Sequence, residues 1–182
     1  MQEYDVIYKA GGCRGIYRRH YRNTPYYPLW KKAASYIDLK SRILDLGCGP
    51  GQFAQMLFDM GVKNYRGIDF SAEAIRMARE KGSGFICADI LTCDYGDYDT
   101  VVCLETLEHI PGDLAVIGRI KKGASIIFSV PDYDSPTHVR LFKDMKKVKN
   151  RYGRLIDIRE SSEFIISEKS FGKIYLCKGV IK

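Results

Sequence analysis

The stretch from Ile43 to Phe53, ILDLGCGPGQF, constrains the fold of this chain more than any other part of the sequence. A short apolar run, typical of a buried strand, leads into Gly47, Gly49 and Gly51, and an amphipathic helical pattern follows. Glycine weakens both strands and helices, so three glycines at a strand-to-helix turn require a compensating role. We expect that role to be the close approach of bare backbone to a ligand.

The remaining sequence alternates strand and helix patterns, which indicates an α/β fold with a mostly parallel sheet. The expected strands lie at 42–46, 65–69, 84–89, 98–105 and 124–130. Helices are expected at 26–39, 53–60, 72–82 (capped by Ser71), 111–120 and within 138–154, where Leu141, Met145, Val148 and Tyr152 share one face. Two final strand-like runs, 155–167 and 173–182, predict a hairpin with its turn around Gly172.

The bulk composition is that of one compact domain. The chain has 182 residues, of which 46% are hydrophobic, and no apolar run approaches the ~20 residues needed to span a bilayer. Its six cysteines form no CxxC pair, and no secretion signal is visible, so we expect a reduced, cytoplasmic protein without structural zinc. The net charge of +7 admits an anionic partner, but we favour the simpler explanation of a solvated helix face.

Carboxylates mark the ends of four successive expected strands, at Asp45, Asp69, Asp89 and Glu105. The carboxyl ends of parallel strands meet at one edge, which is where open α/β sheets bind ligands. Asp69 stands about 20 residues after the glycines, the position that hydrogen-bonds ribose hydroxyls. Gln52 replaces the third glycine of the GxGxxG dinucleotide fingerprint, which argues against a diphosphate ligand and hence against a nicotinamide-dependent dehydrogenase.

The segments ILDLGCGPGQF, YRGIDFSAEAIRMAR, FICADI, YDTVVCLETLEHI and ASIIFSVP occur in this order over about residues 40–131. Together they resemble the successive motifs of class I S-adenosylmethionine-dependent methyltransferases, of the UbiG/UbiE-like small-molecule type. The resemblance implies a single Rossmann-like domain: a seven-stranded, mostly parallel sheet with a C-terminal antiparallel hairpin and helices on both faces. It divides the chain into a helical lid (1–40), a cofactor-binding core (41–131) and a substrate-side loop, helix and hairpin (132–182).

The resemblance also implies S-adenosylmethionine as cofactor and S-adenosylhomocysteine as product. By position in the motifs, Asp69 holds the ribose hydroxyls, Phe70 flanks the adenine and Glu105 lies near the sulfonium. The full set of implied cofactor contacts is Asp45, Gly47, Cys48, Gly49, Gly51, Asp69, Phe70, Asp89, Ile90, Leu104 and Glu105.

Catalysis of methyl transfer chiefly requires alignment, and a general base is needed only when the acceptor carries a proton. We expect His109, His138 and Glu108 to be the catalytic residues, because their loops open at the cofactor edge. The ETLEH segment resembles both UbiG-like O-methyltransferases and small-RNA 2′-O-methyltransferases, in which two Glu and two His bind a divalent metal. We favour a site without metal, in which Glu105 touches the cofactor and Glu108 caps the next helix; a metal held with His138 is the alternative.

The expected function is transfer of a methyl group to an oxygen or nitrogen of a small molecule, by a monomer or homodimer. No [DNS]PP[YFW] tetrapeptide follows the strand at 98–105, and no target-recognition domain is inserted. The alternative is an RNA methyltransferase, 2′-O-directed and metal-assisted, because the tyrosines and arginines of the first 30 residues suit base stacking beside phosphate. A non-catalytic protein built on the fold is disfavoured by intact motifs on four strands.

Overall fold

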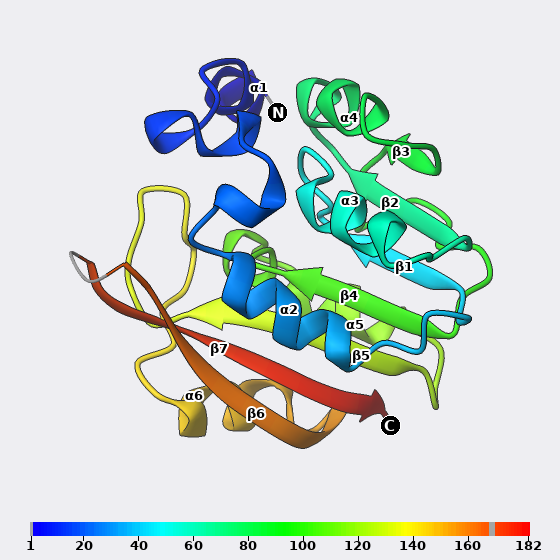
Figure 1. Ribbon diagram of the computed structural model, residues 1–182. Coiled ribbons are helices and arrows are strands. Elements are labelled where there is room, and N and C mark those ends of the chain that lie inside the picture. The colour runs from blue at the N-terminus through cyan, green and yellow to red at the C-terminus, as the bar shows by residue number, and fades with distance from the viewer. Residues whose placement is uncertain (1, 168–169) are drawn as a thin grey trace.

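A computed structural model describes residues 2–167 and 170–182, and there a seven-stranded sheet has the order β3-β2-β1-β4-β5-β7-β6 (Figure 1). Strands β1 to β5 pair in parallel, and β7 runs antiparallel to both β5 and β6. The strands are β1 (Ile43–Leu46), β2 (Tyr65–Asp69), β3 (Phe85–Cys87), β4 (Thr100–Leu104), β5 (Ser125–Pro131), β6 (Ile156–Ser167) and β7 (Ser170–Ile181). The expected sheet and its C-terminal hairpin are confirmed.

Helices cover both faces of this sheet (Figure 1). They are α1 (Gln2–Lys9), α2 (Tyr27–Ser35), α3 (Gln52–Asp59), α4 (Ala72–Arg79), α5 (Asp113–Gly118) and α6 (Met145–Tyr152), with 3₁₀ turns η1 (Cys13–Arg18), η2 (Tyr21–Asn23) and η3 (Leu107–His109). Within β4, Val102 packs into the core under α2 and α3, whereas Val101 and Cys103 pack into the core under α5 and α6. Burial on both faces explains why β4 is continuously apolar rather than alternating.

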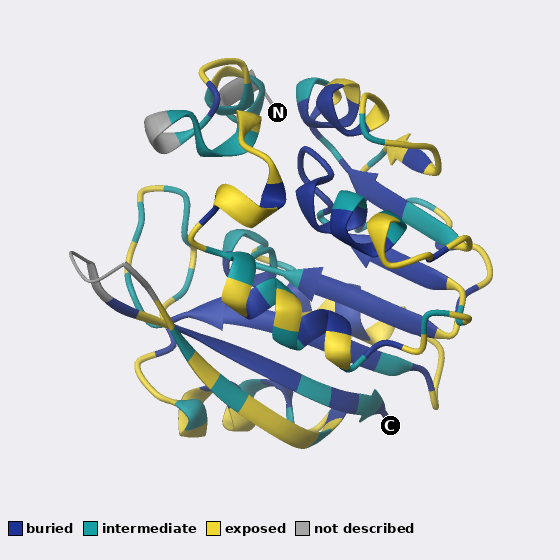
Figure 2. Cartoon of the chain, in the orientation of Figure 1, coloured by how far each residue is buried: buried dark blue, intermediate teal, exposed yellow. Residues whose placement is uncertain are grey.

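The functional edge is set by strand order. Strand β1 lies between β2 and β4. The chain adds β2 and β3 on one side of β1 and then crosses back to add β4 and β5 on the other side. Parallel α/β sheets bind ligands in the crevice outside the carboxyl ends of the strands at such a reversal. In Figure 2 the central strands are dark blue, and β6 at the sheet edge shows exposed residues. The loops after β1, β2 and β4 therefore meet above a rigid, buried base.

Several element boundaries differ from the sequence expectation. Helix α2 ends at Ser35 rather than near residue 39, because Asp38 accepts a hydrogen bond from the Lys40 N–H (3.0 Å) in a turn that leads into β1. Leu141 precedes α6 and is 39% exposed, so placing it on the apolar face of that helix was wrong. Asp144 sets the start of α6, since its carboxylate accepts from the Lys147 N–H at 2.8 Å.

The turn expected around Gly172 was also misplaced. Gly172 lies inside β7 and is buried, and the chain between β6 and β7 falls on residues 168–169, outside the described residues. A side chain at Gly172 would meet the Tyr133 ring at 2.5 Å, so this glycine serves close packing rather than chain reversal. Among the described helices, none combines the length and apolar character required to cross a bilayer.

Candidate active site

The glycine turn between β1 and α3 has two separate physical causes. All three glycines adopt positive φ, at 77° for Gly47, 53° for Gly49 and 75° for Gly51, a region that other residues enter only with strain. A Cβ at Gly47 would lie 2.4 Å from the Thr106 side chain, and one at Gly51 would lie 3.0 Å from the Ala78 backbone. Only at Gly49 is the nearest atom on the lid, the Tyr8 hydroxyl at 3.3 Å. Backbone approach to a ligand thus fits Gly49, while its two neighbours are required by packing.

Asp69 connects the end of β2 to this turn. Its carboxylate accepts hydrogen bonds from the N–H of Gly49 (2.9 Å) and the N–H of Ser71 (2.9 Å). Burial raises the pKa of Asp69 to about 6. Asp45, one strand away, accepts from the Tyr65 hydroxyl at 2.7 Å, and burial raises its pKa to about 7. Two buried carboxyl groups therefore lie beside the turn on adjacent strands, and burial withholds from both the water that would stabilise their ionised forms.

Replacing Asp45 with asparagine is expected to raise the melting temperature of the ligand-free protein at about pH 8, by an amount that disappears near pH 4. The folded-state pKa of Asp45, about 7, lies above its ordinary value of 3.8. The folded protein thus holds this proton more tightly, and ionisation removes stability as pH rises between those values, on the order of 4 kcal/mol in total. Asparagine keeps an acceptor for Tyr65 and carries no charge.

Thermal melts of both proteins at the two pH values measure this effect. Asp99→Asn is the control, because Asp99 is exposed and its pKa is lowered by hydrogen bonds from Arg42. That variant is expected to lose stability at the higher pH, which is the opposite sign. An equal gain for Asp45→Asn at both pH values would show that ionisation is not the cause.

A cavity of about 120 Å³ opens where these loops meet the N-terminal segment. Of the expected cofactor contacts, it is lined by Asp45, Gly47, Cys48, Gly49, Leu104 and Glu105. Aromatic side chains form its other walls: Tyr8, Tyr17, Tyr26, Trp30 and Phe53. Asp89 and Ile90 do not line it: Asp89 is exposed and accepts from the Leu91 N–H (2.8 Å), while Ile90 packs into the core. The loop after β3 is therefore not joined to this cavity.

Glu105 has the backbone of a constrained site residue. It is the non-glycine residue with positive φ, 50°, among those described. Such a conformation costs on the order of 1–3 kcal/mol and persists only where its surroundings enforce it. Ser129 on β5 does so, accepting from the Glu105 N–H (2.9 Å) and donating its hydroxyl to the Glu105 carboxylate (2.8 Å). Burial raises the pKa of this carboxyl to about 7.

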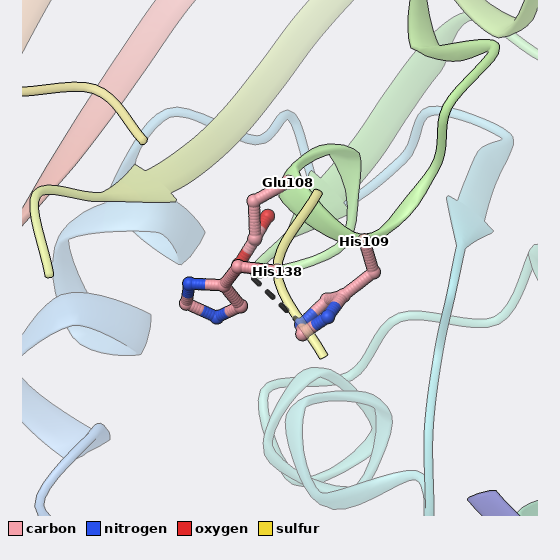
Figure 3. A group of neighbouring side chains, drawn as sticks. All are labelled: Glu108, His109 and His138. Atoms are coloured by element: carbon pink, nitrogen blue, oxygen red, sulfur yellow. Dashed lines mark ion pairs between the residues drawn. The ribbon is translucent and has the colours of Figure 1, made fainter. Parts of the chain in front are cut away.

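Glu108, His109 and His138 form a cluster on the segments that follow β4 and β5, in which His109 Nε2 lies 3.7 Å from the Glu108 carboxylate (Figure 3). One ligand atom from each lies within 4.8 Å of the others. Glu108 is 1% exposed, and within the described chain neither of its carboxylate oxygens has a hydrogen-bond partner. The expected role of Glu108 as a helix cap is wrong, because α5 starts at Asp113 without any side-chain cap. An unpartnered buried carboxylate is costly, so its persistence points to a ligand.

Both imidazoles of the cluster are oriented by backbone carbonyls. His109 Nδ1 lies 3.0 Å from the Thr137 carbonyl, and His138 Nδ1 lies 3.1 Å from the Tyr133 carbonyl. A carbonyl only accepts, so each Nδ1 carries the hydrogen and each Nε2 keeps its lone pair. Burial lowers the pKa of both histidines, which favours this neutral form. Imidazoles held in this way suit either proton acceptance or metal ligation.

The N-terminal segment closes over these groups. Asp5 on α1 accepts from the Ser71 hydroxyl (2.5 Å) and the Glu73 N–H (3.2 Å) at the start of α4. Tyr4 then reaches the site, where its ring meets Phe70 edge-on at 5.1 Å and its hydroxyl lies 3.1 Å from His109 Nδ1.

Sequence reasoning placed a lid here and missed Tyr4 as a site residue. The available signal was the pair Tyr4 and Tyr8, one helical turn apart. The amide of Gln52 also holds the lid, donating to the carbonyls of Ile16 (3.0 Å) and Arg19 (2.7 Å). Gln52, which replaces the third glycine of the dinucleotide fingerprint, thus anchors the N-terminal lid.

Comparisons with known proteins agree with this arrangement. The sequence profile of the family described as a methyltransferase domain matches residues 17–169. A ubiquinone biosynthesis O-methyltransferase of Thiobacillus denitrificans is 30% identical over 111 residues, which are 54% of this chain and 47% of that protein. Similarity to a UbiG-type protein was the sequence expectation, and it is confirmed.

Solved structures share the whole architecture. The 1,6-didemethyltoxoflavin-N1-methyltransferase of Burkholderia thailandensis, with bound 1,6-didemethyltoxoflavin and S-adenosylhomocysteine, aligns with a TM-score of 0.76 at 15% identity, over 100% of this chain and 86% of that one. The magnesium protoporphyrin IX methyltransferase of Synechocystis PCC 6803, with bound S-adenosylmethionine, aligns with a TM-score of 0.62 at 20% identity, over 86% of this chain and 77% of that one. At these identities the likeness shows the fold alone.

The chain spans about half the length of the curated relatives it matches. The family profile covers most of the chain, from within the lid through the end of β6, and leaves out β7. The strand order and the parallel pairing with an antiparallel β7 agree with the class I architecture expected from the motifs. This chain belongs to the methyltransferase-domain family.

Proposed function

We propose that this chain is an S-adenosylmethionine-dependent methyltransferase that acts on a small-molecule acceptor, at an oxygen in preference to a nitrogen. The observation that carries the proposal is Asp69 bonded to the Gly49 N–H, which ties the end of β2 to the turn after β1. Gly49 lines the aromatic cavity, and this hydrogen bond holds the Asp69 carboxylate directly against that part of the cavity wall. Similarity to a ubiquinone biosynthesis O-methyltransferase supports an oxygen acceptor.

The residues present suit the chemical groups of this cofactor. Asp69 accepts hydrogen bonds and is buried, as required to hold a pair of ribose hydroxyls. Asp45 and Glu105 place acidic groups on the cavity wall, where a methionine ammonium and a sulfonium carry positive charge. Tyr8, Tyr26 and Trp30 add aromatic faces, which attract cations. Phe70 stays assigned to the adenine, and Asp89 and Ile90 are proposed to reach it from the loop after β3.

The cofactor supplies an electrophilic methyl group, and the chain aligns the acceptor and excludes water. The lid contributes both, because Tyr4 and Tyr8 cover the edge of the sheet beside Phe70 and Gly49. A hydroxyl acceptor must lose its proton as the new bond forms. We assign that proton to the free Nε2 lone pairs of His109 and His138, which the carbonyls behind them keep available.

A metal-assisted form of this reaction is the second candidate, and the isolated Glu108 carboxylate favours it. Two imidazole Nε2 atoms and one carboxylate are a donor set for a divalent transition metal, and the Nδ1–H bonds to carbonyls are the supporting contacts such ligands make. Glu108, His109 and His138 would hold the ion. Bound there, a divalent cation lowers the pKa of a coordinated hydroxyl. This departs from the metal-free site preferred from sequence.

An RNA acceptor remains the alternative for substrate class, and salt dependence separates the two. In the lid, Arg18 donates to the Lys9 carbonyl at 2.6 Å and Arg22 lies over the Tyr21 ring at 5.3 Å, so these two arginines are engaged within the protein. Affinity for RNA would fall steeply and linearly in log–log plots as salt rises, whereas a neutral small acceptor would show little change. A steep slope in binding assays with short RNA would favour the alternative.

Calorimetric titration with S-adenosylhomocysteine, run beside NAD, tests the proposed function. We expect saturable binding of S-adenosylhomocysteine alone, because Gln52 occupies the position at which a diphosphate-binding turn needs its third glycine. Turnover with labelled S-adenosylmethionine is then measured against phenolic and catecholic acceptors. Binding of NAD, or of neither compound, would refute the proposal.

A further inference from the structure

Two loops carry the proposed catalytic cluster, and one arginine joins them. Glu108 and His109 follow β4, whereas His138 follows β5, about 30 residues later. Arg140 lies two residues after His138 and is largely buried, with 14% of its side chain exposed. We propose that Arg140 is a positioning residue, which sets the distance between the Glu108–His109 pair and His138 and thereby assembles the site; its consequence for catalysis rests on the proposed function.

The contacts of Arg140 define this junction. Its Nη1 donates to the carbonyls of Leu107 and, at 2.6 Å, Ile110, and its Nη2 donates to the carbonyl of Pro111 at 3.0 Å. These carbonyls lie on both sides of Glu108 and His109. The guanidinium of Arg140 therefore connects the segment after β5 to the segment after β4 on both sides of the Glu108–His109 pair.

The backbone beside Arg140 continues the junction. The Val139 N–H donates to the Glu108 carbonyl at 2.8 Å, and the Thr137 carbonyl accepts from His109 at 3.0 Å. The rings of His109 and His138 consequently lie 4.8 Å apart between centroids. Loss of the guanidinium would remove a donor from all three carbonyls and leave this pairing without its anchor. The backbone N–H groups of Ile110 (3.3 Å) and Asp113 (3.2 Å) would still donate to the carbonyls of Leu107 and Ile110.

Asp113 supplies the counter-charge and, with it, a matched control. Asp113 is fully buried and pairs with Arg140 (3.2 Å) and with Arg151 on α6 (2.6 Å), and it also accepts from the Tyr152 hydroxyl (2.8 Å). Arg151 shares the carboxylate but makes no contact with the carbonyls of the loop. Replacing Arg151 thus disturbs the same ion cluster without touching the junction.

The chain contains only three histidines, so nitrogen-labelled histidine spectra report directly on the cluster. In the parent protein, long-range ¹H–¹⁵N spectra are expected to show His109 and His138 as the Nδ1–H tautomer, because each bonds a carbonyl through Nδ1. Arg140→Gln is expected to convert both toward a tautomer mixture. Arg151→Gln is expected to preserve both signals, and His20, on the lid, serves as the internal reference.

Arg140→Lys is a second variant, which keeps the test decisive if Arg140→Gln does not fold. Lysine keeps a positive charge for Asp113 but cannot fork to three carbonyls. We expect it to keep the fold while shifting the same histidine signals and lowering kcat about tenfold, the size of a supporting-contact effect, with unchanged affinity for S-adenosylhomocysteine.

Each outcome decides the proposal. Parent-like histidine signals in both Arg140 variants would overturn it, as would equal shifts in Arg151→Gln. If the parent protein binds no S-adenosylhomocysteine, the proposed function fails, yet the tautomer spectra still decide the placement by Arg140. Histidine signals that change with unchanged kcat would confirm the junction and remove its role in catalysis.

Discussion

Replacing Asp69 with alanine is expected to weaken binding of S-adenosylhomocysteine at least about 100-fold. Two charge-assisted hydrogen bonds to ribose hydroxyls would be lost, each worth about 1.5–3 kcal/mol. The substitution also removes the acceptor of the Gly49 N–H and of the Ser71 N–H, so the turn after β1 loses its connection to β2. Calorimetric titration of the purified variant measures the change in affinity.

Asp69→Asn separates these two causes. Asparagine keeps one oxygen for a backbone N–H and has the same size, but it lacks the charge and one acceptor, so we expect a folded protein with about tenfold weaker binding. Asp99→Ala is the control, since Asp99 is an exposed partner of Arg42 far from the cavity. Unchanged affinity in both Asp69 variants would remove the ribose assignment from this residue.

For the metal-assisted candidate, chelation of divalent cations is expected to lower turnover at least about 100-fold, and added Mn²⁺ or Zn²⁺ to restore it, while affinity for S-adenosylhomocysteine stays the same. The reason is the cluster of Glu108, His109 and His138, in which a buried carboxylate without a hydrogen-bond partner lies 3.7 Å from the His109 Nε2 and within 4.8 Å of a ring nitrogen of His138. Turnover before and after treatment with a chelator, and metal content by mass spectrometry, measure the effect.

Glu108→Gln tests the assignment to this cluster. The variant keeps the volume of the side chain and removes its charge, so the restored activity is expected to be lost while the cofactor still binds. Glu80→Gln is the matched control on an exposed helix end. If chelation has no effect on the parent protein, the cluster works without metal, and His109→Ala is then expected to reduce turnover by about 10²–10⁴, as for removal of a general base. Full turnover in that variant would exclude His109 from both roles.

The elements on which the site is built could be predicted because their signals are local. A strand, a glycine turn and an amphipathic helix leave periodic patterns within about 20 residues, as at 43–60. Parallel pairing then places every carboxyl end at one edge, so the convergence of Asp45, Asp69 and Glu105 followed from strand order alone. The Ser71 cap was predictable for the same reason, because a cap acts within one turn.

Predictions failed where the local structure depends on a contact that the local sequence pattern does not show. Gly172 resembles a turn residue in sequence, yet it is a buried strand position that the Tyr133 ring fills. The strand expected at 84–89 ends at Cys87, so Asp89 lies in the following loop, where its carboxylate accepts from the Leu91 N–H; its contact with the adenine stays a prediction. Leu141 fits a helical face and lies in a loop, because the cap at Asp144 starts the helix later.

The amino-acid pattern of this chain is sufficient for the class of fold, the edge that binds and the type of cofactor expected there. Those properties depend on backbone conformation and hydrophobic periodicity, which neighbouring residues impose on one another. The environment of Glu108 and the partners of His109 depend instead on how distant segments of the chain pack together. A carboxylate at a loop is a cap, a ligand or a solvated charge according to which polar atoms packing brings to it. Here packing leaves the Glu108 carboxylate without a hydrogen-bond partner, while it brings Tyr4 and Thr137 to His109 and Arg140 to the Leu107 carbonyl.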